Sequence, residues 1–239
     1  MTDMKNWYLH KDMAKYLKKT HNPHYDKHHI KVPFRACIVG SSGAGKTSTL
    51  LTLISLMPDT FEKIVIVTKN KDEPLYNFLY EKTGGKNGNV KILEFDKEGI
   101  PDINKEFDPD FNSLLVFDDL VNQTEKEQRP IADAFIRARK RGCSLIYISQ
   151  SFYAIPKMIR NNLTHIFLKQ VSSMKNLVMI SRECSLDIPK KELIDMYKDA
   201  TKDKMGFLLF DLDAPPEKKF RKNFDEYFEI TWGWGMNYP

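Results

Sequence analysis

The sequence predicts an α/β fold with a mainly parallel β-sheet flanked by helices. Short runs rich in β-branched and aromatic residues alternate with helical stretches along most of the chain, as in folds made of strand–helix–strand units. Two of these runs, 64–67 and 114–117, are continuously apolar, as expected for strands that helices cover on both faces. With 239 residues, 41% of them hydrophobic, the chain can form one large domain with arms.

The expected strands follow one another from residue 34 onward, each bounded by polar or glycine-containing segments. They are 34–39, 64–68, 90–94, 113–117, 144–149, 165–168 and 206–210. A helical stretch over 47–56 directly follows the first strand. We therefore expect a domain over 33–212, preceded by a basic N-terminal arm (1–32) and followed by a basic and aromatic C-terminal tail (213–239).

The net charge of +5, from 37 basic and 32 acidic residues, is unevenly distributed. Residues 1–35 hold eight basic against three acidic side chains, and further basic groups lie at 126–160 and 218–222. Such patches suggest a polyanionic partner such as nucleic acid, although a solvated surface explains any single patch equally well.

Several classes of protein are disfavoured. The longest charge-free stretch, 142–156, has 15 residues and contains Ser, Gln and Pro, whereas a membrane span needs about 18 apolar residues. The first 19 residues carry seven charges and no apolar block, unlike a secretory signal. The three cysteines are far apart, without a metal or disulfide pattern. We expect an intracellular protein without a membrane span.

A phosphate-binding loop follows the first strand. Residues 40–47 match the pattern G-x-x-x-x-G-K-S/T between a strand and a helix. Backbone N–H groups of such a loop surround phosphate oxygens, its lysine reaches the β- and γ-phosphates, and its threonine binds Mg²⁺. The alternative is an ordinary glycine-rich turn. The residues expected to bind ATP are Gly40, Ser41, Ser42, Gly43, Ala44, Gly45, Lys46, Thr47 and Ser48, with Thr47 also a metal ligand.

Two acidic residues end the fourth expected strand. The apolar run 114–117 leads into Asp118 and Asp119, and a phosphate loop needs an acid on a second strand for its metal. We expect Asp118 to contact Mg²⁺, directly or through water, and Asp119 to orient the attacking water as a base. The alternative is that Asp119 caps the next helix.

A polar residue, Gln150, follows the fifth expected strand. Its amide can donate to a γ-phosphate and accept from the attacking water. Lying after the acidic strand, Gln150 resembles the polar residue of ATPases in which this strand is inserted between the other two, so we expect the fifth strand to lie between the first and fourth in the sheet. That order would bring Lys46, Asp118 and Gln150 together; the alternative is a polar residue at a strand end.

These motifs together resemble the genome-packaging ATPases of the FtsK/HerA superfamily, in the branch found in large DNA viruses and virophages. The residues concerned are the loop 40–47, Asp118 with Asp119, and the segment 141–150 followed by Pro156 and 159–162. The resemblance spans about 32–212. It implies a homo-oligomeric ring, a pentamer or hexamer, that hydrolyses ATP between subunits and drives double-stranded DNA into a capsid of viral proteins. It also implies the host cytoplasm, at the viral factory, or the virion as location.

A site at a subunit boundary needs an arginine from the neighbouring subunit, which stabilises charge on the γ-phosphate. The candidates are Arg137, Arg139 and Arg141 before the fifth strand and Arg160 after it. For each one the alternative is a solvent-exposed side chain or a contact with DNA phosphates. Two other functions stay open: a P-loop kinase for small molecules or nucleosides, and a non-catalytic, nucleotide-dependent assembly protein.

Overall fold

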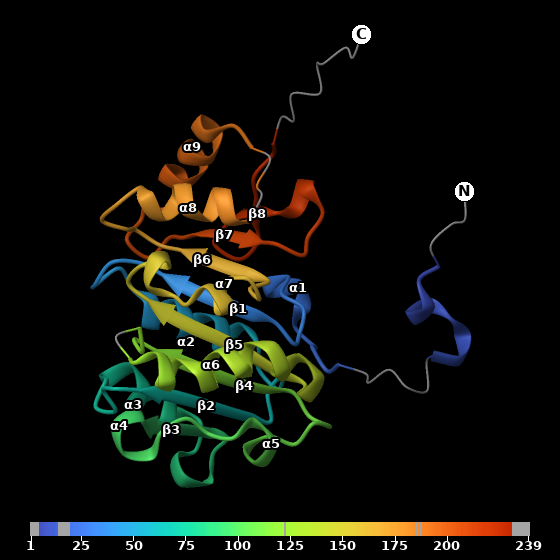
Figure 1. The fold of residues 1–239 in the computed structure, drawn as a ribbon, viewed down its shortest axis with the longest axis vertical. Helices are drawn as coiled ribbons and strands as arrows, with labels where there is room; N and C mark the ends of the chain where they lie inside the picture. Colours follow the sequence, from blue (N-terminus) through green and yellow to red (C-terminus); the bar gives the residue numbers. More distant parts are fainter. Residues whose placement is uncertain (1–4, 14–19, 122, 185, 187, 231–239) are drawn as a thin grey trace.

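A twisted β-sheet crosses the middle of the molecule (Figure 1). The computed structural model describes residues 5–13, 20–121, 123–184, 186 and 188–230. Within them the sheet has nine strands in the order β3-β2-β4-β5-β1-β6-β7-β8-β9. The strands are β1 (Arg35–Val39), β2 (Lys63–Thr68), β3 (Val90–Glu94), β4 (Ser113–Asp118), β5 (Cys143–Ser149), β6 (His165–Leu168), β7 (Leu208–Asp211), β8 (Phe220–Lys222) and β9 (Glu226–Tyr227).

The first six strands are parallel to one another, and β7, β8 and β9 continue the sheet in antiparallel fashion. The seven strands expected from the sequence are all present, and their ends lie within two residues of the expected positions. The predicted fold class, a mainly parallel sheet flanked by helices, is therefore confirmed.

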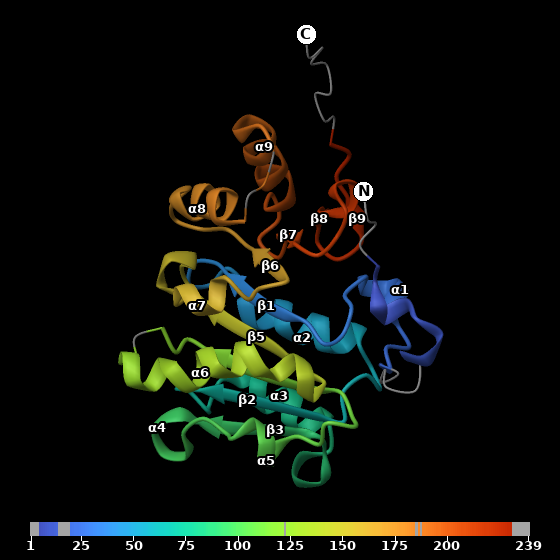
Figure 2. The same cartoon turned by 45° about the vertical axis from the view of Figure 1, so that its right-hand side comes forward.

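Helices cover both faces of the sheet (Figure 2). The α-helices are α1 (Tyr25–His28), α2 (Lys46–Leu56), α3 (Pro74–Lys82), α4 (Phe95–Glu98), α5 (Ile103–Glu106), α6 (Glu125–Arg137), α7 (Lys157–Arg160), α8 (Lys175–Glu183) and α9 (Lys190–Ala200). Short 3₁₀ turns are η1 (Trp7–Leu9), η2 (Lys11–Met13), η3 (Gly85–Asn87), η4 (Ala138–Arg141), η5 (Phe152–Ala154) and η6 (Pro216–Lys218).

Alternate residues of each central strand enter two separate hydrophobic cores. In β4, Leu115 and Phe117 join the core beneath α6, α8 and α9, whereas Leu114 and Val116 join the core beneath α2 and α3. Because successive side chains of a strand point to opposite faces, a strand that is buried on both faces must be apolar at every position. This two-sided burial explains the continuous apolar runs in the sequence.

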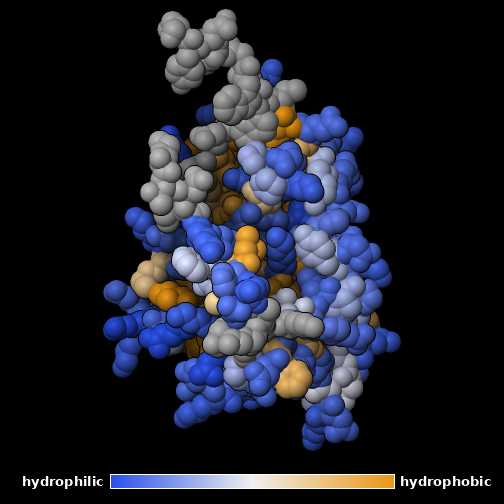
Figure 3. All heavy atoms as spheres, turned by 90° about the vertical axis from the view of Figure 1, so that its right-hand side faces the viewer, coloured by the Kyte–Doolittle hydropathy of each residue, from blue (hydrophilic) through white to orange (hydrophobic). Residues whose placement is uncertain are grey.

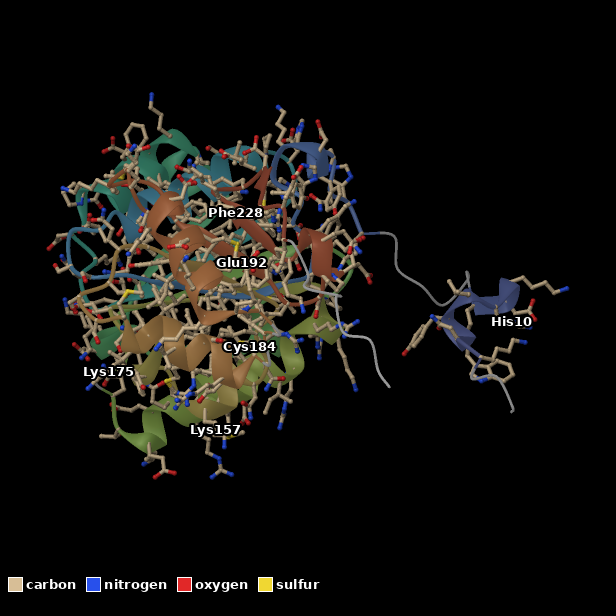
Figure 4. The ribbon with its side chains drawn as sticks, turned by 90° about the horizontal axis from the view of Figure 1, so that it is seen from above. His10, Lys157, Lys175, Cys184, Glu192 and Phe228 are labelled. Carbon is tan, nitrogen blue, oxygen red and sulfur yellow. The ribbon has the colours of Figure 1, made fainter. Side chains whose placement is uncertain are left out.

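The expected C-terminal tail contributes to this sheet. Strands β8 and β9 lie within 213–239, and Phe228 after them packs against the core beneath α9. Figure 4 shows Phe228 beside Glu192 of α9, and both line one shallow hollow. The sequence gives little sign of these strands because each is only two or three residues long. Residues 231–239 lie outside the described residues.

Part of the expected N-terminal arm is also packed into the domain. Ile30 is fully buried and Val32 nearly so, both in the core beneath α2 and α3. The sequence of this arm also predicts one short helix near residues 12–18, of which the structure describes only the turn η2, ending at Met13; residues 14–19 are not described. The lysines at 15, 18 and 19 therefore lie outside the described residues.

The buried imidazole of His28 makes stability depend on pH. Its Nδ1 accepts a hydrogen bond from the Ile30 N–H (3.0 Å), and burial lowers the pKa of His28 to about 4, with nearby His29 and Arg221 acting in the same direction. An unfolded histidine has a pKa near 6.5, so between about pH 6.5 and 4 the unfolded state binds the extra proton. Stability is thus fully present above about pH 6.5 and falls on acidification.

We expect the free energy of unfolding to drop by about 2 to 3 kcal/mol between pH 7 and pH 4 because of this residue alone. Urea unfolding at several pH values measures the loss. In His28→Asn, whose side-chain oxygen can still accept from Ile30, the drop should shrink by that amount. The exposed His21→Asn serves as control and should keep the wild-type dependence. An unchanged pH dependence in His28→Asn would contradict this role.

The large exposed apolar side chains include three consecutive residues of η1, Trp7, Tyr8 and Leu9. Figure 3 shows a largely hydrophilic face interrupted by small, separate hydrophobic spots. In the described part of the chain, no helix combines the length and the apolar character needed to cross a membrane.

Candidate nucleotide-binding site

The loop between β1 and α2 presents free backbone N–H groups to solvent. Gly45 is the N-terminal cap of α2 and adopts a left-handed conformation (φ 80°), with no side chain capping the helix. The first N–H groups of a helix lack partners within it, and the positive end of the helix dipole favours an anion. This geometry fits phosphate oxygens, as the sequence predicts for residues 40–48.

The ammonium of Lys46 lies at the mouth of the loop. Its Nζ donates to the carbonyl oxygens of Gly40 (2.9 Å) and Ser41 (3.1 Å). Burial lowers the pKa of Lys46, whereas the negative charges of Asp118 and Asp119 oppose the shift. The lysine therefore lies close enough to both acids for their charges to act on it.

The order of strands brings the expected site residues together. Strand β5 lies between β1 and β4, as predicted from the position of Gln150. The Gly40 N–H donates to the Ser149 carbonyl (3.2 Å), and the Asp119 N–H donates to the Ile148 carbonyl (3.2 Å). The carboxyl ends of the three strands are thus joined, and Gln150, exposed directly after β5, lies at the same edge.

A tyrosine from α3 completes the surroundings of Asp118. The Tyr76 hydroxyl donates to Asp118 Oδ2 (2.6 Å), and Thr47 is close enough to lower the pKa of the phenol against the larger effect of burial. Burial raises the pKa of Asp118, and the bond from Tyr76 counteracts it. Two oxygen-bearing side chains, Thr47 and Asp118, therefore converge around one phenol.

This donor set fits Mg²⁺, which is commonly held by one or two carboxylates, together with substrate phosphates and water. Clusters of three or more His, Cys, Asp or Glu side chains suited to a metal are absent among the described residues. A cation at Thr47 and Asp118 would thus need the phosphates to complete its coordination.

Asp119 does not cap the helix that follows it. The N-terminal cap of α6 is Thr124, whose side chain accepts from the Glu127 N–H while Glu127 returns a bond to Thr124. The alternative prediction, that Asp119 caps the next helix, is therefore wrong. Instead, Asp119 is exposed and adopts a left-handed conformation (φ 54°). For a residue other than glycine this conformation costs about 1 to 2 kcal/mol, and such strain concentrates at functional sites.

The arginines before β5 lie away from this edge of the sheet. Arg137 ends α6, and Arg139 and Arg141 belong to η4, which precedes the amino end of β5. Arg139 acts on the pKa of Arg35 at the amino end of β1. The structure therefore does not bring these arginines to the phosphate loop of their own chain, which lies at the carboxyl ends of the strands.

Arg160 is held within its own chain. Its Nε and Nη2 donate to the Glu183 carboxylate of α8 (2.7 and 2.9 Å), and Nη1 donates to the Ile155 carbonyl (2.6 Å). The guanidinium thus ties α7 to α8. This differs from the expected role at a neighbouring site, and the reason is Glu183, which is 23 residues away in sequence and gave no signal of the contact.

Two residues of this region were missed by sequence reasoning. Tyr76 reaches Asp118 only because α3 packs beside α2, and its position in the sequence carries no sign of that. Lys169 directly follows β6, the strand next to β1, and its side chain is fully buried. A polar residue at the end of an apolar strand was the available signal, the same one that identified Gln150.

Curated relatives are known for this chain among poxviruses. It is 25% identical over 181 residues to the DNA packaging protein OPG160 of Monkeypox virus, a match that covers 70% of this chain and 57% of that protein. The corresponding protein of Vaccinia virus (strain Copenhagen) is also 25% identical, with 64% of its length covered. The chain thus spans less than two thirds of the length of these relatives.

The fold is similar to that of a solved viral genome packaging NTPase. The genome packaging NTPase B204 from Sulfolobus turreted icosahedral virus 2, solved with AMPPCP, superposes with a TM-score of 0.53 at 15% identity. The match covers 77% of this chain and 95% of that one. The family model described as Poxvirus A32 protein matches residues 22–211. The resemblance to viral packaging ATPases indicated by the motifs is thereby confirmed, and the chain belongs to the Poxvirus A32 protein family.

Proposed function

We propose that this chain is an ATP-hydrolysing motor that translocates double-stranded DNA into a viral capsid. The observation that carries the proposal is the meeting of Lys46, Asp118, Asp119 and Gln150 at one edge of the sheet, where β5 separates β1 from β4. The whole constellation lies within the expected domain 33–212, to whose core Ile30 and Val32 also belong and whose sheet β8 and β9 extend. The names of the poxvirus relatives and of the B204 structure point to the same function.

Each side chain has a distinct part in the proposed reaction. Within residues 40–48, the N–H groups that are not bonded to carbonyls of the chain bind the phosphates of ATP together with the Lys46 ammonium. Thr47 and Asp118 hold Mg²⁺, which neutralises charge on the phosphates. Asp119, exposed beside them, orients and deprotonates the attacking water. Gln150 senses the γ-phosphate through its amide.

The proposed assembly is a homo-oligomeric ring, a pentamer or hexamer, that docks on viral capsid proteins. Its place of action would be the cytoplasm of the infected cell, at the viral factory, or the virion itself. DNA would be bound through phosphates by lysine and arginine, so that any sequence can pass. Affinity for duplex DNA should then fall steeply with salt, because each neutralised phosphate releases counterions.

A small-molecule kinase is the alternative from another class. The position of β5 and the exposed Gln150 after it favour the motor, because the amide would meet the γ-phosphate and a water. ATP turnover by the purified protein distinguishes the two functions. Stimulation by duplex DNA of any sequence is expected, whereas stimulation only by a small phosphate acceptor would overturn the proposal in favour of a kinase.

We further propose that Arg139 or Arg141 completes the site of the neighbouring subunit. Both lie at the edge opposite their own phosphate loop, where a neighbour in a ring could approach, whereas Arg160 is held by Glu183. Mixing two inactive variants tests this arrangement. Subunits with Arg141→Ala or Arg139→Ala, mixed with Asp119→Asn subunits, should regain part of the turnover, since some boundaries then combine two intact halves. No recovery with either arginine variant would contradict a shared site.

The hydrogen bond from Tyr76 to Asp118 predicts a specific effect on Mg²⁺. In Tyr76→Phe, Asp118 loses the donor that orients its carboxylate, and such supporting contacts are worth about tenfold or more in metal affinity. The Mg²⁺ concentration for half-maximal turnover should therefore rise about tenfold, and Mn²⁺ binding by the nucleotide complex should weaken likewise.

Tyr147→Phe is the matched control, because that buried hydroxyl bonds to Gln128, away from the phosphate loop. It should leave the Mg²⁺ requirement unchanged. Equal Mg²⁺ requirements in Tyr76→Phe and wild type would show that the tyrosine has no part in holding the metal ligand.

A further inference from the structure

A second lysine runs beneath the phosphate loop. The side chain of Lys169 is fully buried, and its aliphatic part packs against both ends of the loop. A Cβ added at Gly40 would lie 2.8 Å from the Lys169 Cβ, and one added at Gly45 would lie 3.6 Å from its Cε. The side chain of Lys169 therefore occupies the space that a larger residue at Gly40 would need, whereas at Gly45 the Met205 sulfur (2.7 Å) fills that space and Lys169 is in ordinary van der Waals contact.

The ammonium of Lys169 contacts uncharged groups, namely three oxygens and the Phe207 ring, whose centroid lies 5.6 Å from Nζ. Its Nζ donates to Thr49 Oγ1 (3.0 Å) in the first turn of α2 and to the carbonyl of Met205 (2.8 Å). Among the described residues no carboxylate forms an ion pair with it. A buried charge without an opposite charge is costly, and here hydrogen bonds and the Phe207 ring compensate this cation only in part.

The charged surroundings of Lys169 are also positive. Lys46 of α2 lies near enough to act on it, and the positive end of the α2 dipole points to the same side. From α9, the Tyr197 phenol donates to the Lys169 carbonyl (3.3 Å), and the segment before β7 contributes the carbonyls of Met205 and Gly206 and the Phe207 ring. Burial, and to a lesser degree Lys46, lower the pKa of Lys169 to about 8.

We propose that Lys169 is a positioning residue of the nucleotide site, whose buried charge is compensated by bound phosphates and which takes up a proton when they bind. The inference rests on the proposed binding of ATP at the loop. Lys169 does not line the loop's outer surface; it acts from below, through its charge and through Thr49, which itself donates to the Gly45 carbonyl (3.1 Å).

The binding of phosphates and the protonation of Lys169 are thermodynamically linked, and this linkage sets how the affinity for ATP changes with pH. Bound phosphates favour the charged lysine and raise its pKa above that of the free protein. At about pH 7 the lysine is charged in both states and contributes its full attraction. Above about pH 8 a proton must be taken up on binding, so the affinity for ATP falls as the pH rises.

Calorimetry with AMPPCP and Mg²⁺ tests this proposal. Titrations at about pH 8 in two buffers of different ionisation enthalpy give the number of protons taken up on binding. Lys169→Met keeps the length of the side chain and removes its charge. The control Lys63→Met alters a strand lysine that pairs with Glu106 (2.7 Å), away from the loop.

We expect proton uptake by the wild type and by Lys63→Met, and its loss in Lys169→Met. The variant should bind about tenfold more weakly at pH 7, and the difference should vanish toward about pH 10, where the wild-type lysine is neutral too. A purely structural role would weaken binding equally at every pH.

Three results separate the possibilities. Equal proton uptake in wild type and Lys169→Met, or a loss of affinity independent of pH, would overturn the inference. If Lys169→Met fails to fold, the wild-type titrations decide alone, and absence of uptake at about pH 8 overturns it. Failure of the folded wild type to bind the nucleotide at all would instead contradict the proposed function.

Discussion

Asp119→Asn is expected to lower ATP turnover by about 10³-fold or more while ATP still binds, whereas Lys46→Ala should abolish tight binding. The asparagine keeps the size of the side chain but cannot accept a proton from water, and a positioned base contributes about 10² to 10⁴ in rate. The alanine removes the ammonium that bonds within the loop mouth, at Gly40 and Ser41. Asp119 activates the attacking water, whereas Lys46 binds the phosphates.

Two measurements on the same preparations separate these roles. Binding of a fluorescent ATP analogue gives the affinity, and release of phosphate gives the turnover. The asparagine in Asp119→Asn also tolerates the left-handed backbone observed at this position, so folding should be unaffected. Equal loss of binding in both variants would contradict the division of labour. Turnover that survives in Asp119→Asn would remove Asp119 as the base.

Arg221→Met is expected to destabilise the fold by about 3 to 5 kcal/mol, because it removes a buried guanidinium that pairs with the partly buried Asp211 and satisfies two carbonyls. Arg221 of β8 is fully buried. Its Nη2 contacts Asp211 Oδ2 (3.0 Å), and its Nη1 donates to the carbonyls of His28 (3.0 Å) and Phe224 (2.9 Å). One guanidinium thus joins the N-terminal segment, the sheet and the segment after β8.

Lys222→Met provides the comparison from the same strand. Lys222 is partly exposed and pairs with the exposed Asp199 at 3.1 Å, and such surface pairs are worth about 0 to 1 kcal/mol. Denaturant unfolding of the two variants should therefore differ by several kcal/mol. A loss below about 1 kcal/mol in Arg221→Met would mean that the last strands contribute little to the fold.

The central sheet and the phosphate edge could be predicted because their signals are local. Each parallel strand is a continuous apolar run, and Asp118 and Gln150 stand directly after such runs. Since the carboxyl ends of parallel strands meet at one edge, the sequence alone was enough to place these side chains near Lys46. The insertion of β5 could be expected only from the likeness to ATPases with the same order of motifs.

What could not be predicted depends on contacts between distant segments. In the sequence Arg221 looks like part of a basic surface patch. In the structure it is buried and bonds to Asp211 and to the carbonyl of His28. Strands β8 and β9 are too short to show an alternation of apolar and polar residues. They form because β8 pairs with β7, and β9 pairs with β8. Tyr76 and Glu183 likewise acquire their roles from the packing of α3 and α8, which no spacing encodes.

The central claim, movement along duplex DNA driven by ATP, is tested most directly by displacement of a third strand. A triplex-forming oligonucleotide is bound near one end of a linear duplex, and its release is followed after addition of the protein and ATP. The account predicts release that requires hydrolysable ATP, occurs on duplexes of unrelated sequence and is absent with Asp119→Asn. Rapid ATP hydrolysis in the presence of duplex DNA without any release of the third strand would contradict it.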